Sequence, residues 1–132
     1  FSKVLEAAKN SIISEKPNLS FIHLAEIDGT GHTFGWQSDI QKRMLEAMDI
    51  PLNDFIKKLS SEFKDLVIII TSDHGGHFIF HGSNSPEDMT IPWIIKGKII
   101  KENTEIKTKV FTYDTAATVL WLLGIEIPND FE

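Results

Sequence analysis

The fold is most readily inferred from residues Leu66–Gly82, with the sequence LVIIITSDHGGHFIFHG. Its first five residues are apolar, and their length and β-branched content are typical of a strand buried in a parallel sheet. Asp73 and His74 follow where that strand should end, with Gly75 and Gly76 behind them. Because ligands of open α/β sheets bind beyond the carboxyl ends of the strands, this carboxylate and imidazole are candidate metal ligands.

A second apolar segment is predicted to end in the same way. Phe21–Ile27 is expected to be a strand inside the sheet, followed by a glycine-rich loop, Asp28–Gly35, with the sequence DGTGHTFG. An Asp and a His four residues apart on such a loop can close on one metal ion. Two strand ends that each deliver an Asp and a His indicate one shared site. The predicted ligands are Asp28, His32, Asp73, His74 and His81.

This mixture of carboxylate and imidazole ligands indicates the kind of metal. It suits zinc first, then manganese, and it suits calcium poorly. Five ligands are too many for one zinc ion and too few for two closed sites. We therefore expect two divalent ions roughly 4 Å apart, each incompletely ligated by protein, as in two-metal phosphoryl transfer.

The rest of the chain predicts a mostly parallel α/β sheet flanked by helices. Apolar residues keep one helical phase across Pro51, which indicates a single kinked helix. Strand, long helix and strand would form a right-handed βαβ unit that brings Asp28 and Asp73 to one sheet edge. The expected elements are helices over residues 3–15 (capped by Ser2), 38–62 and 116–123, strands over 21–27, 66–70, 91–95 and 109–112, and a loop over 82–88.

Composition and charge narrow the class of protein. The chain has 132 residues, enough for one domain, and 42% of them are hydrophobic. Its net charge of −6 argues against nucleic acid as a partner. No apolar run approaches the ~20 residues of a membrane span. The chain starts at Phe1 without an initiator Met or a signal peptide, so we expect a piece of a longer protein, and its compartment stays undecided.

Several motifs together resemble one protein superfamily. They are Asp28-x-x-Gly-His-x-x-Gly35, Ser72-Asp-His-Gly75, the later His81-Gly82, TIPWII from Thr90, and YDTAATVLWLLG ending at Gly124. The combination, which spans about residues 20–126, is similar to the alkaline phosphatase superfamily. Within it, the type I phosphodiesterase and nucleotide pyrophosphatase branch is the nearest in pattern.

The resemblance implies roles for the predicted ligands. Asp28, His32 and His81 would hold one metal ion, and Asp73 with His74 the second. The family's Thr or Ser nucleophile and a further Asp lie on earlier strands, and no segment before Asp28 matches them. Residues 1–132 are therefore expected to be one α/β domain that forms the C-terminal part of a larger alkaline phosphatase-like catalytic domain, with the nucleophile upstream of Phe1.

The function expected from this resemblance is metal-dependent hydrolysis of a small phosphate ester, of the phosphodiesterase or phosphatase type. The resemblance is also compatible with an extracytoplasmic location. The alternatives are a sulfatase, a phosphomutase or a phosphoethanolamine transferase of the same superfamily, or a non-catalytic metal-binding fragment. If neighbouring strands of the sheet lie outside this chain, its exposed sheet edges would invite self-association.

Four residues near the motifs have roles that the pattern leaves open. Glu26 could accept a hydrogen bond from a ligating histidine or simply face the sheet edge. His77 is expected to be a loop histidine or a supporting residue of the site, and His23 a histidine in the core. Trp36 would either wall a substrate pocket or pack on the sheet.

Overall fold

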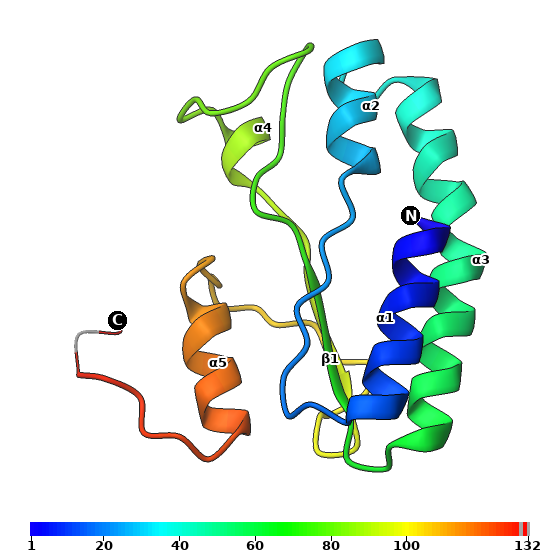
Figure 1. The fold of residues 1–132 in the computed structure, drawn as a ribbon. Coiled ribbons are helices and arrows are strands. Elements are labelled where there is room, and N and C mark those ends of the chain that lie inside the picture. Colours follow the sequence, from blue (N-terminus) through cyan, green and yellow to red (C-terminus); the bar gives the residue numbers. More distant parts are fainter. Residues whose placement is uncertain (130, 132) are drawn as a thin grey trace. The chain divides into compact units, whose positions relative to one another are not determined.

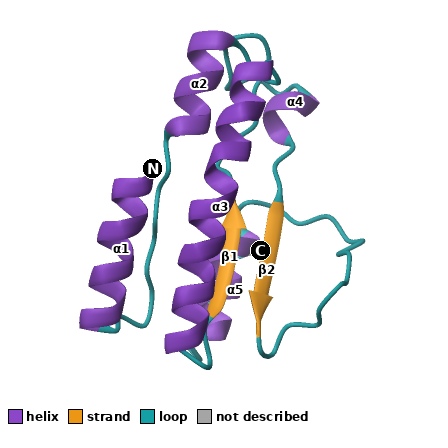
Figure 2. Cartoon of the chain, turned by 90° about the vertical axis from the view of Figure 1, so that its right-hand side faces the viewer, coloured by secondary structure: helices purple, strands orange, loops and turns teal. Residues whose placement is uncertain are grey.

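The computed structural model describes residues 1–129 and 131, which fall into two compact units, Phe1–Ile99 and Ile100–Glu132. Figures 1 and 2 show the course of the chain. The first unit carries α1 (Ser2–Glu15), α2 (Glu26–Phe34), α3 (Asp39–Glu62), β1 (Val67–Thr71), α4 (Pro86–Met89) and β2 (Trp93–Gly97). The second carries α5 (Asp114–Leu122).

Helices α1 and α3 lie side by side and form the core of the first unit (Figure 1). Leu5 of α1 is buried against Phe55 and Leu59 of α3, as expected for two amphipathic helices that turn their apolar faces together. The predicted helix over residues 3–15 is confirmed, although Ser2 is its first helical residue and not its cap. Lys16 ends it in a left-handed conformation with φ of 49°.

Helix α3 is continuous from Asp39 to Glu62 with Pro51 inside it, so the prediction of a single helix is confirmed. Ser38 caps it, because its side-chain oxygen accepts a hydrogen bond from the Gln41 amide at 3.2 Å. The kink at Pro51 stays a prediction. Buried Met48, together with the core residues of this helix, keeps the apolar phase read from the sequence.

The sheet differs from the prediction. Strands β1 and β2 were both expected, and they pair antiparallel from Val67–Gly97 to Thr71–Trp93 (Figure 2). Within the described residues they are the whole sheet, so the mostly parallel sheet is not formed by this chain. A parallel pair needs a crossover connection, whereas consecutive strands joined without one come back antiparallel.

The predicted strand Phe21–Ile27 is wrong. Residues 21–25 have no regular structure, and Phe21 is 90% exposed. An isolated apolar segment gains nothing from being extended unless a neighbouring strand accepts its hydrogen bonds, and the described chain offers none there. The expected βαβ unit is therefore absent from the described chain.

The predicted loop Asp28–Gly35 is also wrong, because α2 begins at Glu26 and runs through it to Phe34. Glu26 and Asp28 lie in its first turn, where carboxylates favour a helix N-terminus. Gly35 ends the helix with a positive φ of 93°.

Two smaller predictions are corrected as well. The loop predicted over residues 82–88 contains the start of α4, which Ser85 caps. The short strand over residues 109–112 does not form. The last helix does form, and Gly124 after it adopts the expected left-handed conformation with φ of 68°. No helix in the described part of the chain combines the length and apolarity needed to cross a membrane.

Candidate metal centre

Helix α2 places the first two predicted ligands on one face. Asp28 and His32 are four residues apart, which in a helix puts their side chains one turn above each other. His32 Nε2 lies 3.4 Å from Asp28 Oδ1. The prediction that Asp28 and His32 lie together was right, although the backbone between them is a helix and not a loop. An Asp and a His four residues apart can bind one ion in either conformation.

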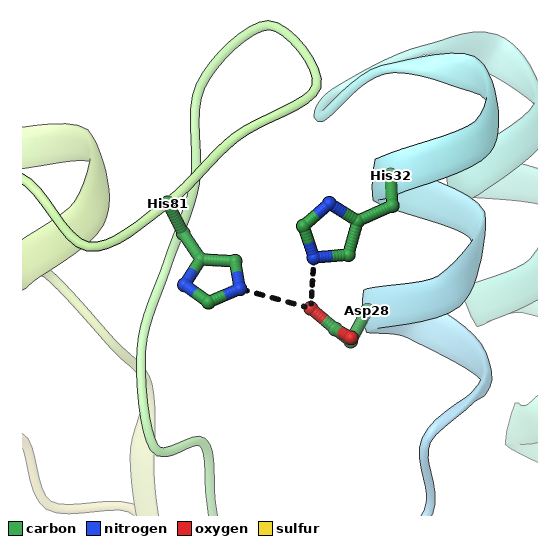
Figure 3. A group of neighbouring side chains, drawn as sticks. All are labelled: Asp28, His32 and His81. Atoms are coloured by element: carbon green, nitrogen blue, oxygen red, sulfur yellow. Dashed lines mark ion pairs between the residues drawn. The ribbon is translucent and has the colours of Figure 1, made fainter.

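The segment after β1 brings two further histidines to the same oxygen. His81 Nε2 lies 3.7 Å from Asp28 Oδ1, and His74 Nε2 lies 3.9 Å from it. The His74 and His81 rings are stacked, with centroids 3.7 Å apart and planes 15° from parallel. Figure 3 shows His81 reaching across from this segment toward Asp28 and His32 on the helix.

Three of these residues form a group of the size that holds one metal ion. The candidate ligand atoms of Asp28, His32 and His81 all lie within 4.8 Å of one another. Three protein ligands with a position left over are the pattern of catalytic zinc sites. This is the same set that the resemblance assigned to a first metal.

Asp28 Oδ1 has the properties of an atom that should face a cation. It is buried, and it has no hydrogen-bond partner among the described residues. The three imidazole nitrogens around it lie 3.4–3.9 Å away, too far for good hydrogen bonds. A buried carboxylate oxygen without a partner is unfavourable, so this donor set fits a divalent ion better than it fits an empty centre.

The outer hydrogen bonds of two histidines support the same conclusion. His32 Nδ1 lies 2.9 Å from the Ile79 carbonyl oxygen, and His74 Nδ1 lies 2.7 Å from the Gly75 carbonyl oxygen. Because a carbonyl can only accept, Nδ1 carries the proton in both rings. In the neutral ring, Nε2 then presents its lone pair toward Asp28, as a metal-ligating histidine does.

Asp73 lies at the edge of this group. Its Oδ2 is 3.7 Å from His74 Nε2, and its side chain is 76% exposed. His74 Nε2 has an oxygen of Asp28 and an oxygen of Asp73 within 3.9 Å. The two carboxylates therefore lie close together beside this nitrogen. The structure thus brings all five predicted ligands to one place, with Asp73 outermost.

Trp36 packs against the histidines. Its ring lies edge-on to His32, with centroids 4.9 Å apart, and to His81 at 5.7 Å. Gly31 and Gly76 leave the space for it, because a Cβ at these positions would stand 2.8 Å and 2.1 Å from the indole. Gly31 of the first motif, and Gly76 directly after the second, therefore leave the space that this ring occupies.

Glu26 and His23 have other surroundings than the pattern suggested. The Glu26 carboxylate faces the backbone nitrogen of Phe1. It does not bond a ligand histidine. His23 is exposed, so the prediction of a core histidine is wrong.

His77 stands outside the group and bonds a residue that the sequence reasoning missed. Its Nδ1 donates to Asp88 Oδ1 at 2.7 Å, and the Ser83 amide donates to Asp88 Oδ2 at 2.8 Å. The hydrogen bond from His77 lowers the pKa of Asp88 to about 2. The signal that could have found Asp88 is Ser85 three residues earlier, a helix-capping spacing inside what was predicted as a loop.

Clustered aspartate and histidine side chains at the carboxyl end of a strand define a candidate divalent-metal centre. Sequence similarity shows the family to which the chain belongs. The chain matches the type I phosphodiesterase / nucleotide pyrophosphatase family over residues 1–91. It belongs to this family, within the alkaline phosphatase superfamily.

The similar proteins include phosphopentomutases and an alkaline phosphatase. The chain is 33% identical to a phosphopentomutase of Alkaliphilus metalliredigens, over 85% of this chain and 27% of that protein. It is 32% identical to a phosphopentomutase of Alkaliphilus oremlandii, over 89% of this chain and 30% of that protein. It is 38% identical to the alkaline phosphatase PhoK of a Sphingomonas species, over 42% of this chain and 10% of that protein.

The chain spans less than a third of the length of these relatives. No solved structure matches it significantly.

Proposed function

We propose that the protein is a metal-dependent phosphoryl-transfer enzyme that hydrolyses a small phosphate ester. Asp28, His32 and His81 would hold one divalent ion, and Asp73 with His74 a second. The observation that carries this proposal is the buried Asp28 Oδ1, which has three imidazole nitrogens within 3.9 Å and no hydrogen-bond partner among the described residues. The family match supports the reaction class.

Zinc or manganese at this centre would polarise a phosphoryl oxygen and lower the pKa of a bound hydroxyl group. The chain's own contribution is the ligand set and its charge. With a net charge of −6, this chain would repel a phosphate ester, so a cationic centre is needed to reverse the local field. Two carboxylates and neutral imidazoles would leave bound divalent cations with net positive charge.

We further propose that this chain is the C-terminal, metal-binding part of a larger catalytic domain whose nucleophile lies elsewhere. The two hydroxyls that precede Asp73 in the sequence are already engaged. Thr71 Oγ1 donates to the Pro92 carbonyl oxygen at 2.9 Å, and Ser72 Oγ donates to the His74 carbonyl oxygen at 2.6 Å. The greater length of the relatives supports this division of the domain.

A groove beside the centre is suited to the organic part of the substrate. It has a volume of about 590 Å³, and it is lined in part by Phe34, Trp36 and Phe78. Trp36 is shared with the histidine cluster, so a phosphoryl group at the metals would have its ester group within reach of aromatic walls.

A second candidate reaction is phosphoryl transfer within one molecule, as in a phosphomutase. The observation that favours it is the similarity to phosphopentomutases over 85–89% of this chain. Mutase and hydrolase differ in whether water or the substrate takes up the phosphoryl group, and the ligands named above would serve either reaction.

The experiment that tests the proposal measures nitrophenol release by its absorbance and follows the phosphate groups by phosphorus NMR. The complete protein that contains this chain is loaded with zinc, which is diamagnetic and leaves the phosphorus signals sharp. Separate samples receive a nitrophenyl phosphodiester, a nitrophenyl phosphate monoester or a pentose phosphate. Release of nitrophenol, with inorganic phosphate appearing from the monoester, supports hydrolysis. A pentose phosphate signal that moves without release of phosphate supports the mutase. Neither change, at full metal occupancy, would overturn the proposed reaction class.

A further inference from the structure

We propose that Asp88 is a positioning residue of the metal centre, because it fixes the segment that carries His74 and His81. The inference rests on the proposed metal site. The Asp88 carboxylate bonds His77 and Ser83, neither of which is a predicted ligand. Asp88 would act by holding the backbone on which two of the predicted ligands stand.

The Asp88 carboxylate ties together the two sides of His81. One oxygen accepts a hydrogen bond from His77 Nδ1 at 2.7 Å, and the other accepts from the Ser83 amide at 2.8 Å. His77 precedes His81 and Ser83 follows it, so one side chain closes the turn that projects this ligand. Hydrogen bonds between the backbones of His77 and Phe80, at 3.0 and 2.9 Å, complete the turn.

The backbone of α4 holds the chain directly after His74. The Gly75 amide donates to the Asp88 carbonyl oxygen at 2.7 Å, and the Gly76 amide donates to the Glu87 carbonyl oxygen at 2.9 Å. This approach is possible only for glycine, because a Cβ at Gly75 would stand 2.0 Å from the Glu87 oxygen. Both ligand histidines of the segment are therefore anchored to one turn of helix.

The same anchor reaches the ligand on α2. His32 Nδ1 bonds the Ile79 carbonyl oxygen at 2.9 Å, and Ile79 lies inside the turn that Asp88 closes. The Asp88 carboxylate thus fixes the turn that carries His81 and the Ile79 carbonyl group bonded by His32, whereas the backbone carbonyl groups of α4 hold the chain after His74. Asp88 is only 2% exposed, and a buried carboxylate is tolerable only while its hydrogen bonds are intact.

The test is cobalt(II) binding by the full chain, followed through the visible absorption bands of the metal. For Asp88→Asn we expect about tenfold weaker binding, the lower end of the loss that follows removal of a direct partner of a metal ligand, and altered band intensities at saturation. The far-UV circular dichroism should stay that of the wild type. Asp114→Asn is the matched control: it also removes a carboxylate that accepts from a backbone amide, here Phe111 at 2.7 Å, but in the second unit.

A second pair of variants keeps the test decisive if Asp88→Asn does not fold. His77→Gln retains a donor for Asp88 and should keep most of the cobalt affinity, whereas His77→Ala should lose it. Asp88→Asn that binds cobalt with wild-type affinity and spectrum would overturn the inference, as would equal losses in Asp88→Asn and Asp114→Asn. If the wild type binds no cobalt, both the proposed metal site and this inference are refuted. If the wild type binds cobalt and Asp88→Asn binds it equally well, only the positioning role of Asp88 is refuted.

Discussion

At the scale of single residues, the most informative atom is Asp28 Oδ1, since the imidazoles gather around it. Replacing His32 by Ala removes one of the three ligands of the compact group with Asp28 and His81. We expect the wild-type chain to bind about one equivalent of zinc or manganese and His32→Ala to bind none measurably, because two ligands rarely retain a zinc ion. Isothermal calorimetry measures both.

His23→Ala is the matched control for this prediction. His23 is an exposed histidine on the segment before α2, and it belongs to no ligand group among the residues that the structure describes. Its replacement should leave zinc binding as it is in the wild type. Equal binding by the wild type and His32→Ala would remove the metal assignment.

The lowered pKa of Asp88 should make the free energy of unfolding depend on pH in the acid range. Its hydrogen bond from His77 lowers the folded-state pKa from 3.8 to about 2, so the unfolded chain binds more protons between these pH values. The stabilisation is complete above the unfolded pKa and is lost as pH falls through the folded one. Urea unfolding between pH 5 and pH 2 should therefore show a loss that is smaller in Asp88→Asn, which has no carboxyl to protonate. Parallel pH profiles for the two proteins would contradict this.

At the scale of elements, α2 contains two glycines whose replacement by alanine should change the stability in opposite directions. Nothing lies within 4 Å of a Cβ built on Gly29, so Gly29→Ala should stabilise the chain by about 0.5–1 kcal/mol through helix propensity. A Cβ on Gly31 would stand 2.8 Å from both Trp36 and Gln41, so Gly31→Ala should destabilise it. Denaturant unfolding of both variants checks the signs. A stabilising Gly31→Ala would show that Trp36 is not held tightly.

The elements also show what could be read from the sequence and what could not. Strand β1 and helix α3 were predictable, because five consecutive apolar residues and a long helical stripe are strong local signals. Phe21–Ile27 gave the same local signal as a strand and failed, since pairing depends on neighbours that the segment itself does not encode. Helix α2 was missed because glycines at 29 and 31 argue locally against a helix.

The candidate site was more predictable than the backbone beneath it. Asp28 and His32 meet on a helix as they would have met on a loop, because only their separation along the chain mattered. Asp88 could not be found in this way. Its partners, the His77 ring and the Ser83 amide, come together only once the segment before α4 has folded back on itself.

At the scale of the whole molecule, the 132-residue chain alone should not turn over phosphodiesters or phosphomonoesters. Phosphoryl transfer of the proposed kind needs a hydroxyl nucleophile at the metals, and Thr71 and Ser72 already donate to backbone carbonyls. Loss of a nucleophile lowers rates by orders of magnitude. A nitrophenyl phosphodiester with saturating zinc or manganese at mildly alkaline pH provides the assay.

The contrary result has a definite meaning. Metal-dependent turnover by the isolated chain that disappears in Asp73→Ala would place a nucleophile inside these 132 residues and refute the division of the catalytic domain. Turnover that Asp73→Ala leaves unchanged would point to a contaminating enzyme. Self-association through the exposed sheet edge stays a prediction, and it calls for this assay to be run at several protein concentrations.

The packing of Trp36 against Gly31 and Gly76 suggests a way to follow metal binding at the centre. An indole in edge contact with His32 and His81 sits where any charge placed between these rings alters its electronic surroundings. The protein therefore carries an intrinsic fluorophore at the candidate centre. Its emission would respond to metal binding over the background of Trp93 and Trp121, and Trp36→Phe would abolish that response.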